Sequence, residues 1–116
     1  MRMKFYRILC TREYQKNIKD SSKKLIEDTI KRFKLDSEFD CQVAVTRHKK
    51  TGSEILYYGL HHNAQEIKSL EGVNIVWCEE SENTSQESID LLIPTIRTEK
   101  SIIIFTLNPD KKENPV

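Results

Sequence analysis

The sequence predicts a single α/β domain built on a mostly parallel sheet. Two short runs, residues 73–78 and 101–107, are apolar without polar alternation, which is typical of strands buried on both faces of such a sheet. A segment with helical periodicity lies between them, as a crossover between parallel strands requires. At 116 residues the chain is long enough to bury one hydrophobic core.

The composition excludes several classes of protein. Lys and Arg (19) nearly balance Asp and Glu (18), so the net charge gives no argument for a strongly electrostatic partner. Cys10, Cys41 and Cys78 stand far apart, which favours reduced thiols over a zinc site or a disulfide framework. No run reaches the ~20 apolar residues of a membrane span, and the N-terminus lacks a signal-peptide core. We therefore expect a soluble cytoplasmic protein without membrane contact.

The first strand and the first helix follow from residues 4–33. Residues 4–10 are aromatic and β-favouring and then turn polar at Thr11, which predicts a strand. The helix that follows should start between Tyr14 and Ser21. Its apolar residues recur at helical spacing: Ile18, Leu25, Ile26, Thr29, Ile30 and Phe33. Its lysines are interleaved with acids, so a solvated face is favoured over a nucleic-acid patch.

The middle of the chain predicts an antiparallel hairpin. Two β-rich runs, residues 39–46 and 54–60, flank a basic, glycine-containing turn at residues 47–53. This tip is a candidate phosphate contact, although hairpin turns are commonly polar without binding a ligand. The adjacent His61 and His62 suggest a metal site, but neighbouring side chains on extended chain point in opposite directions and no Cys or acid lies at ligand spacing. A surface loop is the favoured interpretation.

The C-terminal part predicts a second helix and a last strand. Thr84 and Glu87 have capping-box spacing, so Thr84 is the expected N-cap. The apolar positions of the helix recur at i, i+3, i+4 and i+7: Ile89, Leu92, Ile93 and Ile96. Pro94 should kink or shorten its last turn. We expect residues 1–110 to form the domain and residues 111–116 to be a polar, disordered tail.

The two acids that follow the apolar run at residues 73–78 are the most informative feature of the sequence. Glu79 and Glu80 follow this run directly, and ionised groups at the end of a buried strand are costly unless something there needs negative charge. A hydrated Mg²⁺ bound to nucleotide phosphate is the commonest such need. This is the Walker B arrangement. The alternative is a strand that runs into a solvated acidic loop, because Glu82 follows closely.

Several segments carry a family resemblance: residues 8–12, 18–21, 59–60, 67–72, 76–81, 92–97 and 104–109. In this order they resemble the ATPase domain of phage terminase large subunits, the motors that drive viral DNA into capsids. The resemblance covers nearly the whole chain. It implies a partial P-loop ATPase-like fold of the ASCE type, with a mostly parallel sheet, flanking helices and an inserted β-hairpin.

The resemblance implies a nucleotide site at the two acids. Glu79 matches the Walker B acid that holds Mg²⁺ through its water shell. Glu80 matches the catalytic carboxylate that orients and deprotonates the water attacking the γ-phosphate of ATP. The implied cofactors of the complete domain are therefore Mg²⁺ and ATP.

Two further groups of residues acquire candidate roles from the resemblance. Thr106, Leu107 and Asn108 match the coupling motif, which senses the phosphate state and relays it to the parts that grip DNA. The alternative is that they only end a strand, since Asn-Pro is a turn signal by itself. Lys68 and Arg97 are candidate cationic contacts to a nucleotide or a neighbouring subunit, with a salt-bridged surface role as the alternative for either one.

One part of the family's pattern is missing. The only glycines are Gly52, Gly59 and Gly72, and no G-x-x-x-x-G-K-[ST] sequence occurs, so the Walker A loop around the phosphates is absent. We also expect this chain to lack the C-terminal nuclease domain of the family. We therefore expect a fragment whose parent activity is ATP hydrolysis that powers translocation of viral DNA, and which is inactive by itself.

The resemblance also implies partners and a location. In the family these are double-stranded DNA, the portal protein and the small terminase subunit, in the cytoplasm of the bacterial host cell. Without a neighbouring strand, the run at residues 101–107 would form an apolar sheet edge, so we expect the fragment to self-associate through this strand or to cover it by refolding its own tail. The alternatives to a terminase fragment are a noncatalytic α/β interaction module and a remnant of another P-loop ATPase.

Overall fold

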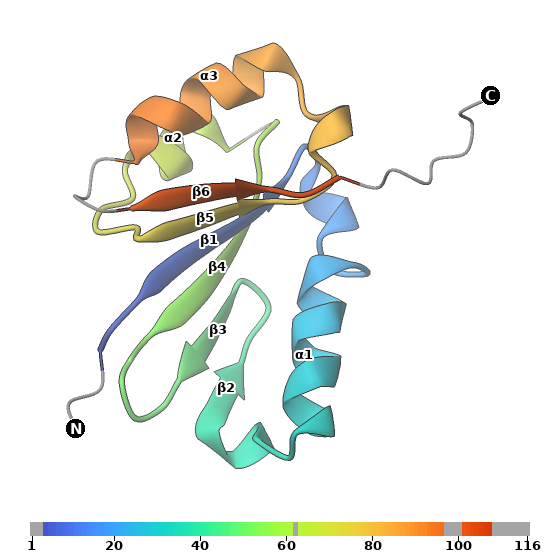
Figure 1. Cartoon of the computed structure of the whole chain (residues 1–116), viewed down its shortest axis with the longest axis vertical. Coiled ribbons are helices and arrows are strands. Elements are labelled where there is room, and N and C mark those ends of the chain that lie inside the picture. Colours follow the sequence, from blue (N-terminus) through green and yellow to red (C-terminus); the bar gives the residue numbers. More distant parts are fainter. Residues whose placement is uncertain (1–3, 62, 97–100, 108–116) are drawn as a thin grey trace.

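Six strands form one sheet in the computed structural model, which describes residues 4–61, 63–96 and 101–107. The strands are β1 (Arg7–Arg12), β2 (Phe39–Cys41), β3 (Val45–His48), β4 (Glu54–Gly59), β5 (Ile75–Cys78) and β6 (Ile102–Phe105). The helices are α1 (Ser22–Arg32), α2 (Ala64–Lys68) and α3 (Gln86–Thr95), with 3₁₀ turns η1 (Gln15–Asn17), η2 (Asp36–Glu38) and η3 (Ser81–Asn83) (Figure 1).

The sheet is mixed, and its strand order is β2-β3-β4-β1-β5-β6. Strands β4, β1, β5 and β6 run parallel, whereas β2, β3 and β4 are joined by antiparallel pairing. The expected mostly parallel α/β sheet with flanking helices and a hairpin is thus confirmed. Within the described part of the chain, no helix is long and apolar enough to cross a membrane.

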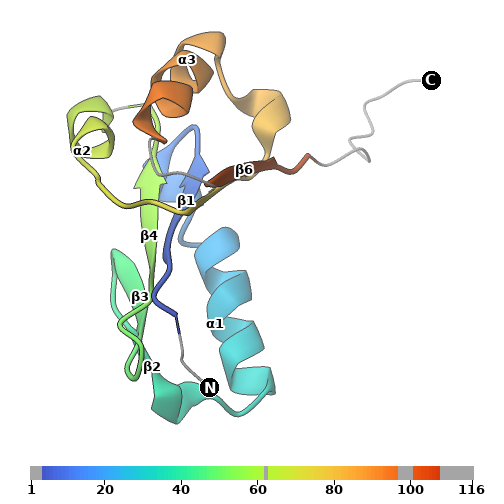
Figure 2. The same ribbon diagram turned by 60° about the vertical axis from the view of Figure 1, so that its left-hand side comes forward.

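Helices cover both faces of the sheet, and each face has its own core (Figures 1 and 2). On one face, α2 and α3 pack through Ile67 and Leu92 against Leu9 and Val76 of the central strands. On the other face lies α1, with Cys10, Ile18 and Tyr57 as the buried cluster and Ile26 packed against it. Because successive side chains of a strand point to opposite faces, Leu9 and Cys10 of β1 serve the two cores in turn.

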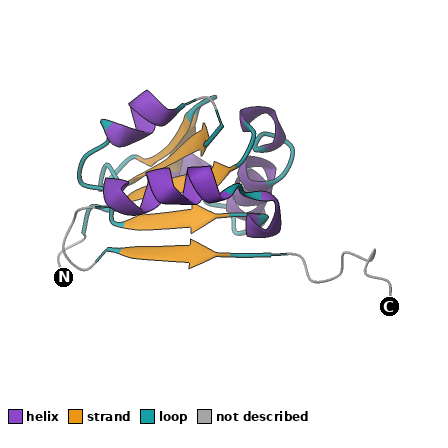
Figure 3. Ribbon diagram, turned by 90° about the horizontal axis from the view of Figure 1, so that it is seen from above, coloured by secondary structure: helices purple, strands orange, loops and turns teal. Residues whose placement is uncertain are grey.

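Strand β6 is the outermost strand on its side of the sheet (Figure 3). Among the described strands it pairs only with β5, in the register Ile75↔Ile102 to Cys78↔Phe105. Ile103 packs against the core beneath α2 and α3. Ile102 and Ile104 point to the opposite face, where they remain 53% and 44% exposed. The apolar edge expected at residues 101–107 is therefore present.

Gly59 is required by a close approach of two segments. A Cβ atom at this position would lie 2.2 Å from the backbone nitrogen of Gln15. The Gln15 side chain then closes the contact, because its Oε1 accepts from the Gly59 amide at 2.7 Å and its Nε2 donates to the Tyr57 carbonyl at 3.1 Å. This contact fixes the end of β4 against the turn that leads into α1.

The structure corrects two predictions about strands. Residues 39–46 do not form one strand, because Gln42 turns the chain and its amide donates to the Val45 carbonyl, so β2 and β3 form a hairpin of their own. The prediction that the run at residues 73–78 is buried on both faces is also wrong in part. Val76 and Cys78 are fully buried, but Ile75 and Trp77 are only half-buried, because the α1-side cluster reaches β5 only through the partly buried Trp77.

Two predictions about helices change as well. Ser85, not Thr84, is the N-cap of α3, and its hydroxyl accepts from the Ser88 amide at 3.1 Å. Helix α3 ends at Thr95, one residue after Pro94, as the missing proline donor predicts. Helix α1 starts at Ser22, so Ile18 lies in the turn before it, and its predicted apolar positions Leu25 and Phe33 are exposed.

Candidate functional site

The carboxyl ends of three parallel strands bring the predicted site residues to one edge of the sheet. The register pairs Thr11 of β1 with Cys78 of β5, and Cys78 with Phe105 of β6. The next residue on each strand is therefore Arg12, Glu79 and Thr106. This edge is where open α/β sheets bind their ligands, because the side chains and loops that follow the strands converge there.

Glu79 and Glu80, hereafter the carboxylate pair, share one arginine. Arg12 Nε donates to Glu79 Oε1 at 3.2 Å, and Arg12 Nη2 lies 3.1 Å from Glu80 Oε2. The arginine side chain is 12% exposed, and the two carboxylate side chains are 22% and 33% exposed. A guanidinium that bridges two partly buried acids holds both in fixed positions.

The backbone at Glu80 explains how two successive residues face the same arginine. On a regular strand their side chains would point to opposite faces of the sheet. Glu80 instead adopts the left-handed conformation, with φ 56° and ψ 46°. This conformation is uncommon for a residue other than glycine, and such residues gather at functional sites. It turns the chain into η3, where Asn83 Nδ2 donates to Glu80 Oε1 at 3.3 Å.

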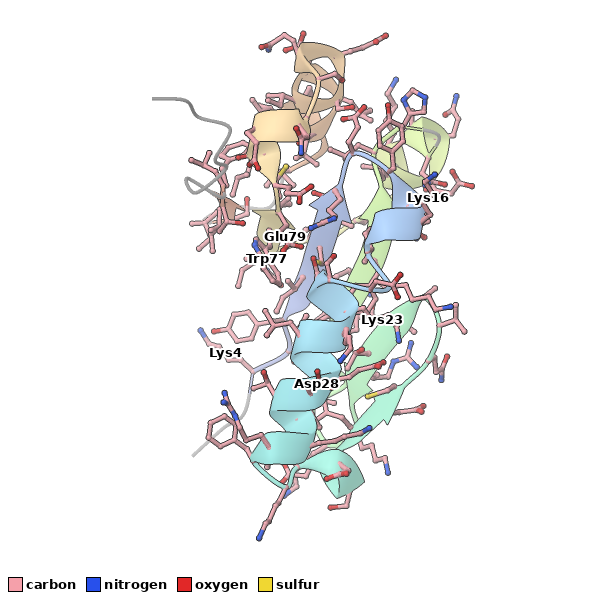
Figure 4. The ribbon with its side chains drawn as sticks, turned by 90° about the vertical axis from the view of Figure 1, so that its right-hand side faces the viewer. Lys4, Lys16, Lys23, Asp28, Trp77 and Glu79 are labelled. Carbon is pink, nitrogen blue, oxygen red and sulfur yellow. The ribbon has the colours of Figure 1, made fainter. Side chains whose placement is uncertain are left out.

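Helix α1 begins beside the carboxylate pair. Ser22, its first residue, is fully buried and donates from its hydroxyl to Oε1 of Glu79, which Figure 4 shows beside the start of α1. Cys10 lies on the same face of β1 as Arg12, and its side chain is also fully buried. Burial raises the pKa of the Cys10 thiol from 9.0 to about 12, and the hydrogen bond with Ser22 lowers it by less. This thiol is therefore uncharged at neutral pH and adds no charge to the site.

Thr106, the first residue of the predicted coupling motif, is hydrogen-bonded both to β5 and to the turn that follows Glu80. Its amide donates to the Cys78 carbonyl at 3.0 Å, and its carbonyl accepts from the Ser81 amide at 2.9 Å. Its hydroxyl accepts from Trp77 Nε1 at 3.0 Å. Leu107 is exposed. Asn108 lies outside the described residues. A displacement at residues 77–81 would therefore reach Thr106 directly.

Lys68 does not join this site. It is the exposed last residue of α2, which covers the face opposite α1, and it borders a cavity of about 440 Å³ with Glu13 and His61. The buried Glu13 carboxylate accepts from the Ser85 amide at 3.1 Å and lies 3.6 Å from His61 Nδ1. Arg97 falls outside the described residues. Lys68 is thus not placed beside the carboxylate pair.

The donor set decides which metal chemistry the site can support. Within the described residues, no three His, Cys, Asp or Glu side chains form a group that could hold a metal ion, so a metal centre made by protein ligands alone does not fit. Mg²⁺ needs less from the protein, because it keeps several waters and takes one or two carboxylates together with substrate phosphates. Glu79 and Glu80 fit this requirement.

The roles of Arg12 and Ser22 were missed from the sequence. In the sequence, Arg12 is only the polar end of a strand, and Ser22 is one of several polar residues before a helix. The missing information was strand pairing, because only the parallel register of β1 and β5 places Arg12 beside Glu79. An arginine at the carboxyl end of one parallel strand and acids at the end of another are the signal that could have found this contact.

Comparisons with known proteins identify similar sequences and folds. A family model described as phage terminase large subunit matches residues 2–116. No curated protein matches the chain. The structure of the large terminase from a thermophilic bacteriophage superposes on 91% of this chain with a TM-score of 0.71, at 7% sequence identity. The chain spans 27% of the length of that terminase, and at this identity the likeness concerns the fold.

Proposed function

Because the chain belongs to the phage terminase large subunit family, we propose that it is part of the ATP-hydrolysing domain of a DNA-packaging motor. Its sheet corresponds to the section of a P-loop ATPase-like, ASCE-type fold that follows the phosphate-binding loop. The parent activity is hydrolysis of ATP to move viral DNA into a capsid. Double-stranded DNA, the portal protein and the small terminase subunit are the proposed partners of the complete protein.

The carboxylate pair is the observation that carries this proposal. Two acids stand at the carboxyl end of a central parallel strand, and the bonds with Arg12 and Ser22 hold them in defined positions. A solvated acidic loop would not need a partly buried guanidinium or a left-handed residue to arrange its side chains. The arrangement favours the Walker B interpretation over the acidic-loop alternative.

Each acid has a separate chemical task. Glu79 is held from two sides, by Ser22 and by Arg12, so its second oxygen is the one that can contact the water shell of a metal ion. Mg²⁺, when bound with ATP, would supply charge neutralisation for the phosphates. Glu80 lies further out and is the more exposed of the two, which suits a base that takes a proton from a water molecule.

Thr106 is the residue that we assign to coupling. It bonds to Trp77 on one side of Glu79 and to Ser81 on the other side of Glu80. A change in the position of either acid would therefore move the end of β6. We assign Leu107 and Asn108 to the same motif, and Lys68 and Arg97 to contacts with a nucleotide or a neighbouring subunit.

The proposal is tested by Glu80→Gln in a protein in which this chain is joined to a phosphate-binding loop. The amide keeps the shape of the side chain but cannot accept the proton, so turnover should fall by about 10² or more while Mg-ATP binding stays near that of the parent. Glu82→Gln, a nearby acid outside the pair, serves as the matched control. Turnover of Glu80→Gln within tenfold of the parent would refute the assignment and favour a noncatalytic interaction module.

A further inference from the structure

We propose that Arg12 is a positioning residue that keeps the carboxylate pair closed to a divalent cation until phosphate groups arrive with it. This inference rests on the proposed function, because it assigns Arg12 a task at the same pair of acids. It goes further in predicting that the site discriminates a metal bound to nucleotide from a free metal.

The geometry shows why a guanidinium and a metal ion compete. Arg12 already occupies Oε1 of Glu79 and Oε2 of Glu80, at 3.2 and 3.1 Å. A cation that draws on both acids must approach the space between them, where the guanidinium lies. Two positive groups there would repel each other, because the Arg12 side chain is 12% exposed and water screens the pair only in part. A free cation that uses both acids therefore displaces at least one of the two arginine contacts, and a cation beside Glu79 Oε2 alone lies next to the guanidinium.

Phosphate changes this balance for a chemical reason. A buried guanidinium that loses its carboxylate partner is left uncompensated, which is strongly unfavourable. Phosphate oxygens offer Arg12 a replacement, because the planar guanidinium matches phosphate as well as carboxylate in a bidentate manner. A metal that arrives with phosphates thus brings the new partner for Arg12, whereas a free aqueous ion does not.

Ser22 keeps the pair in place while Arg12 moves. Its buried hydroxyl bonds to Glu79 independently of Arg12 and comes from the first turn of α1, a separate element. Loss of the arginine contacts therefore frees Glu80 Oε2 and removes the guanidinium from beside Glu79, while Ser22 still holds Glu79 Oε1. This difference separates the two residues, since Ser22 stabilises the pair in every state and Arg12 only in the metal-free state.

The experiment measures binding of manganese(II) alone to the chain, followed by the electron paramagnetic resonance signal of the free ion. Arg12→Ala should bind Mn²⁺ about tenfold more tightly than the parent, the order expected when a charged hydrogen-bond competitor is removed. Adding Glu79→Gln to Arg12→Ala should abolish the gain. Arg47→Ala removes an arginine paired with Glu54 away from the site, and it should leave Mn²⁺ affinity unchanged.

Unchanged or weaker Mn²⁺ binding by Arg12→Ala would overturn the proposal, since an arginine with only a structural role would not block a metal. Circular dichroism establishes first that the variant is folded. If Arg12→Ala does not fold, Arg12→Gln, which keeps much of the side-chain length without the charge, decides by the same criterion. The outcome is independent of ATP turnover, so Glu80→Gln can fail as a test of function while this result stands, and the reverse.

Discussion

The two faces of the sheet differ in how completely they are covered. Beneath α2 and α3, Leu9, Val76 and Leu92 are fully buried and the core extends from β4 to β6. On the α1 face, the core closes over β1 and β4 but leaves Ile102 and Ile104 of β6 exposed. The core beneath α2 and α3 thus spans four strands, β4, β1, β5 and β6, whereas the core on the α1 side does not reach β6.

The carboxylate pair lies on the less completely covered face. Arg12 and Glu79 alternate with the apolar residues of their strands and fall on the α1 face, where Ser22 meets them. The face beneath α2 and α3 has the more continuous core, and the α1 face carries the carboxylate pair together with Arg12. Burying the carboxylate pair fully would raise its desolvation cost, so a partly open face is where such residues can stand.

The largest expected effect compares equivalent truncations on the two faces. Leu92→Ala should lower the free energy of unfolding by about 2–5 kcal/mol, because it leaves a cavity in a closed core. Ile104→Ala removes an exposed side chain and should cost less than about 0.5 kcal/mol. Urea unfolding at low protein concentration measures both. Equal costs would mean that the α1 face is as well packed as the other one.

Alkaline pH should weaken the α1 face in particular. Burial raises the pKa of Cys10 from 9.0 to about 12 and the pKa of Tyr57 from 10.0 to about 12. The folded chain therefore holds these protons more tightly than the unfolded chain does, so their contribution is fully present below pH 9.0 and is lost as pH rises towards about 12.

The measurement is the urea midpoint as a function of pH. It should fall steadily above pH 9.0 in the parent and fall less steeply in Cys10→Ala, which has no thiol to titrate. A midpoint that stays constant to pH 11, or the same slope in both proteins, would contradict this account of the α1-side core; that upper limit is about 1 unit below the pKa values of the buried groups.

A smaller effect concerns the edge of β6. Unpaired backbone groups beside exposed Ile102 and Ile104 are a template for another chain, so the protein should self-associate at high concentration. Ile104→Lys should abolish association in light scattering, whereas Leu25→Lys, at an exposed apolar position of α1, should not. A monodisperse monomer with fast amide exchange along β6 would contradict the prediction.

Local patterns predicted the parts of the fold that depend on local residues. Period and composition indicated β5, β6 and the long helices, and the order of elements followed from them. Helix α2 was not predicted, because its five residues bury only Ile67 and offer no periodicity. The N-cap of α3 was misplaced by one residue, since the Glu13 carboxylate, distant in sequence, accepts from the Ser85 amide and favours Ser85 over the neighbouring Thr84.

The residues of the candidate site also differ in whether local sequence patterns could predict them. Glu79 and Glu80 were predicted because adjacent acids after an apolar run are visible in the sequence itself. Arg12 and Ser22 lie 67 and 57 residues from Glu79 along the chain, and only the paired strands and the packed helix bring them together. Contacts of this kind depend on register, which a pattern within one segment does not encode.

The most direct test of the central claim is calorimetric titration of the chain with Mg-ATP. Under our proposal the carboxylate pair supplies one half of an ATP site, but the sequence contains no loop whose backbone amides and lysine could hold the β- and γ-phosphates. We predict no binding in the micromolar range and no hydrolysis by this chain, with both gained when a phosphate-binding loop is joined to it. Micromolar affinity for Mg-ATP in the chain by itself would contradict the account.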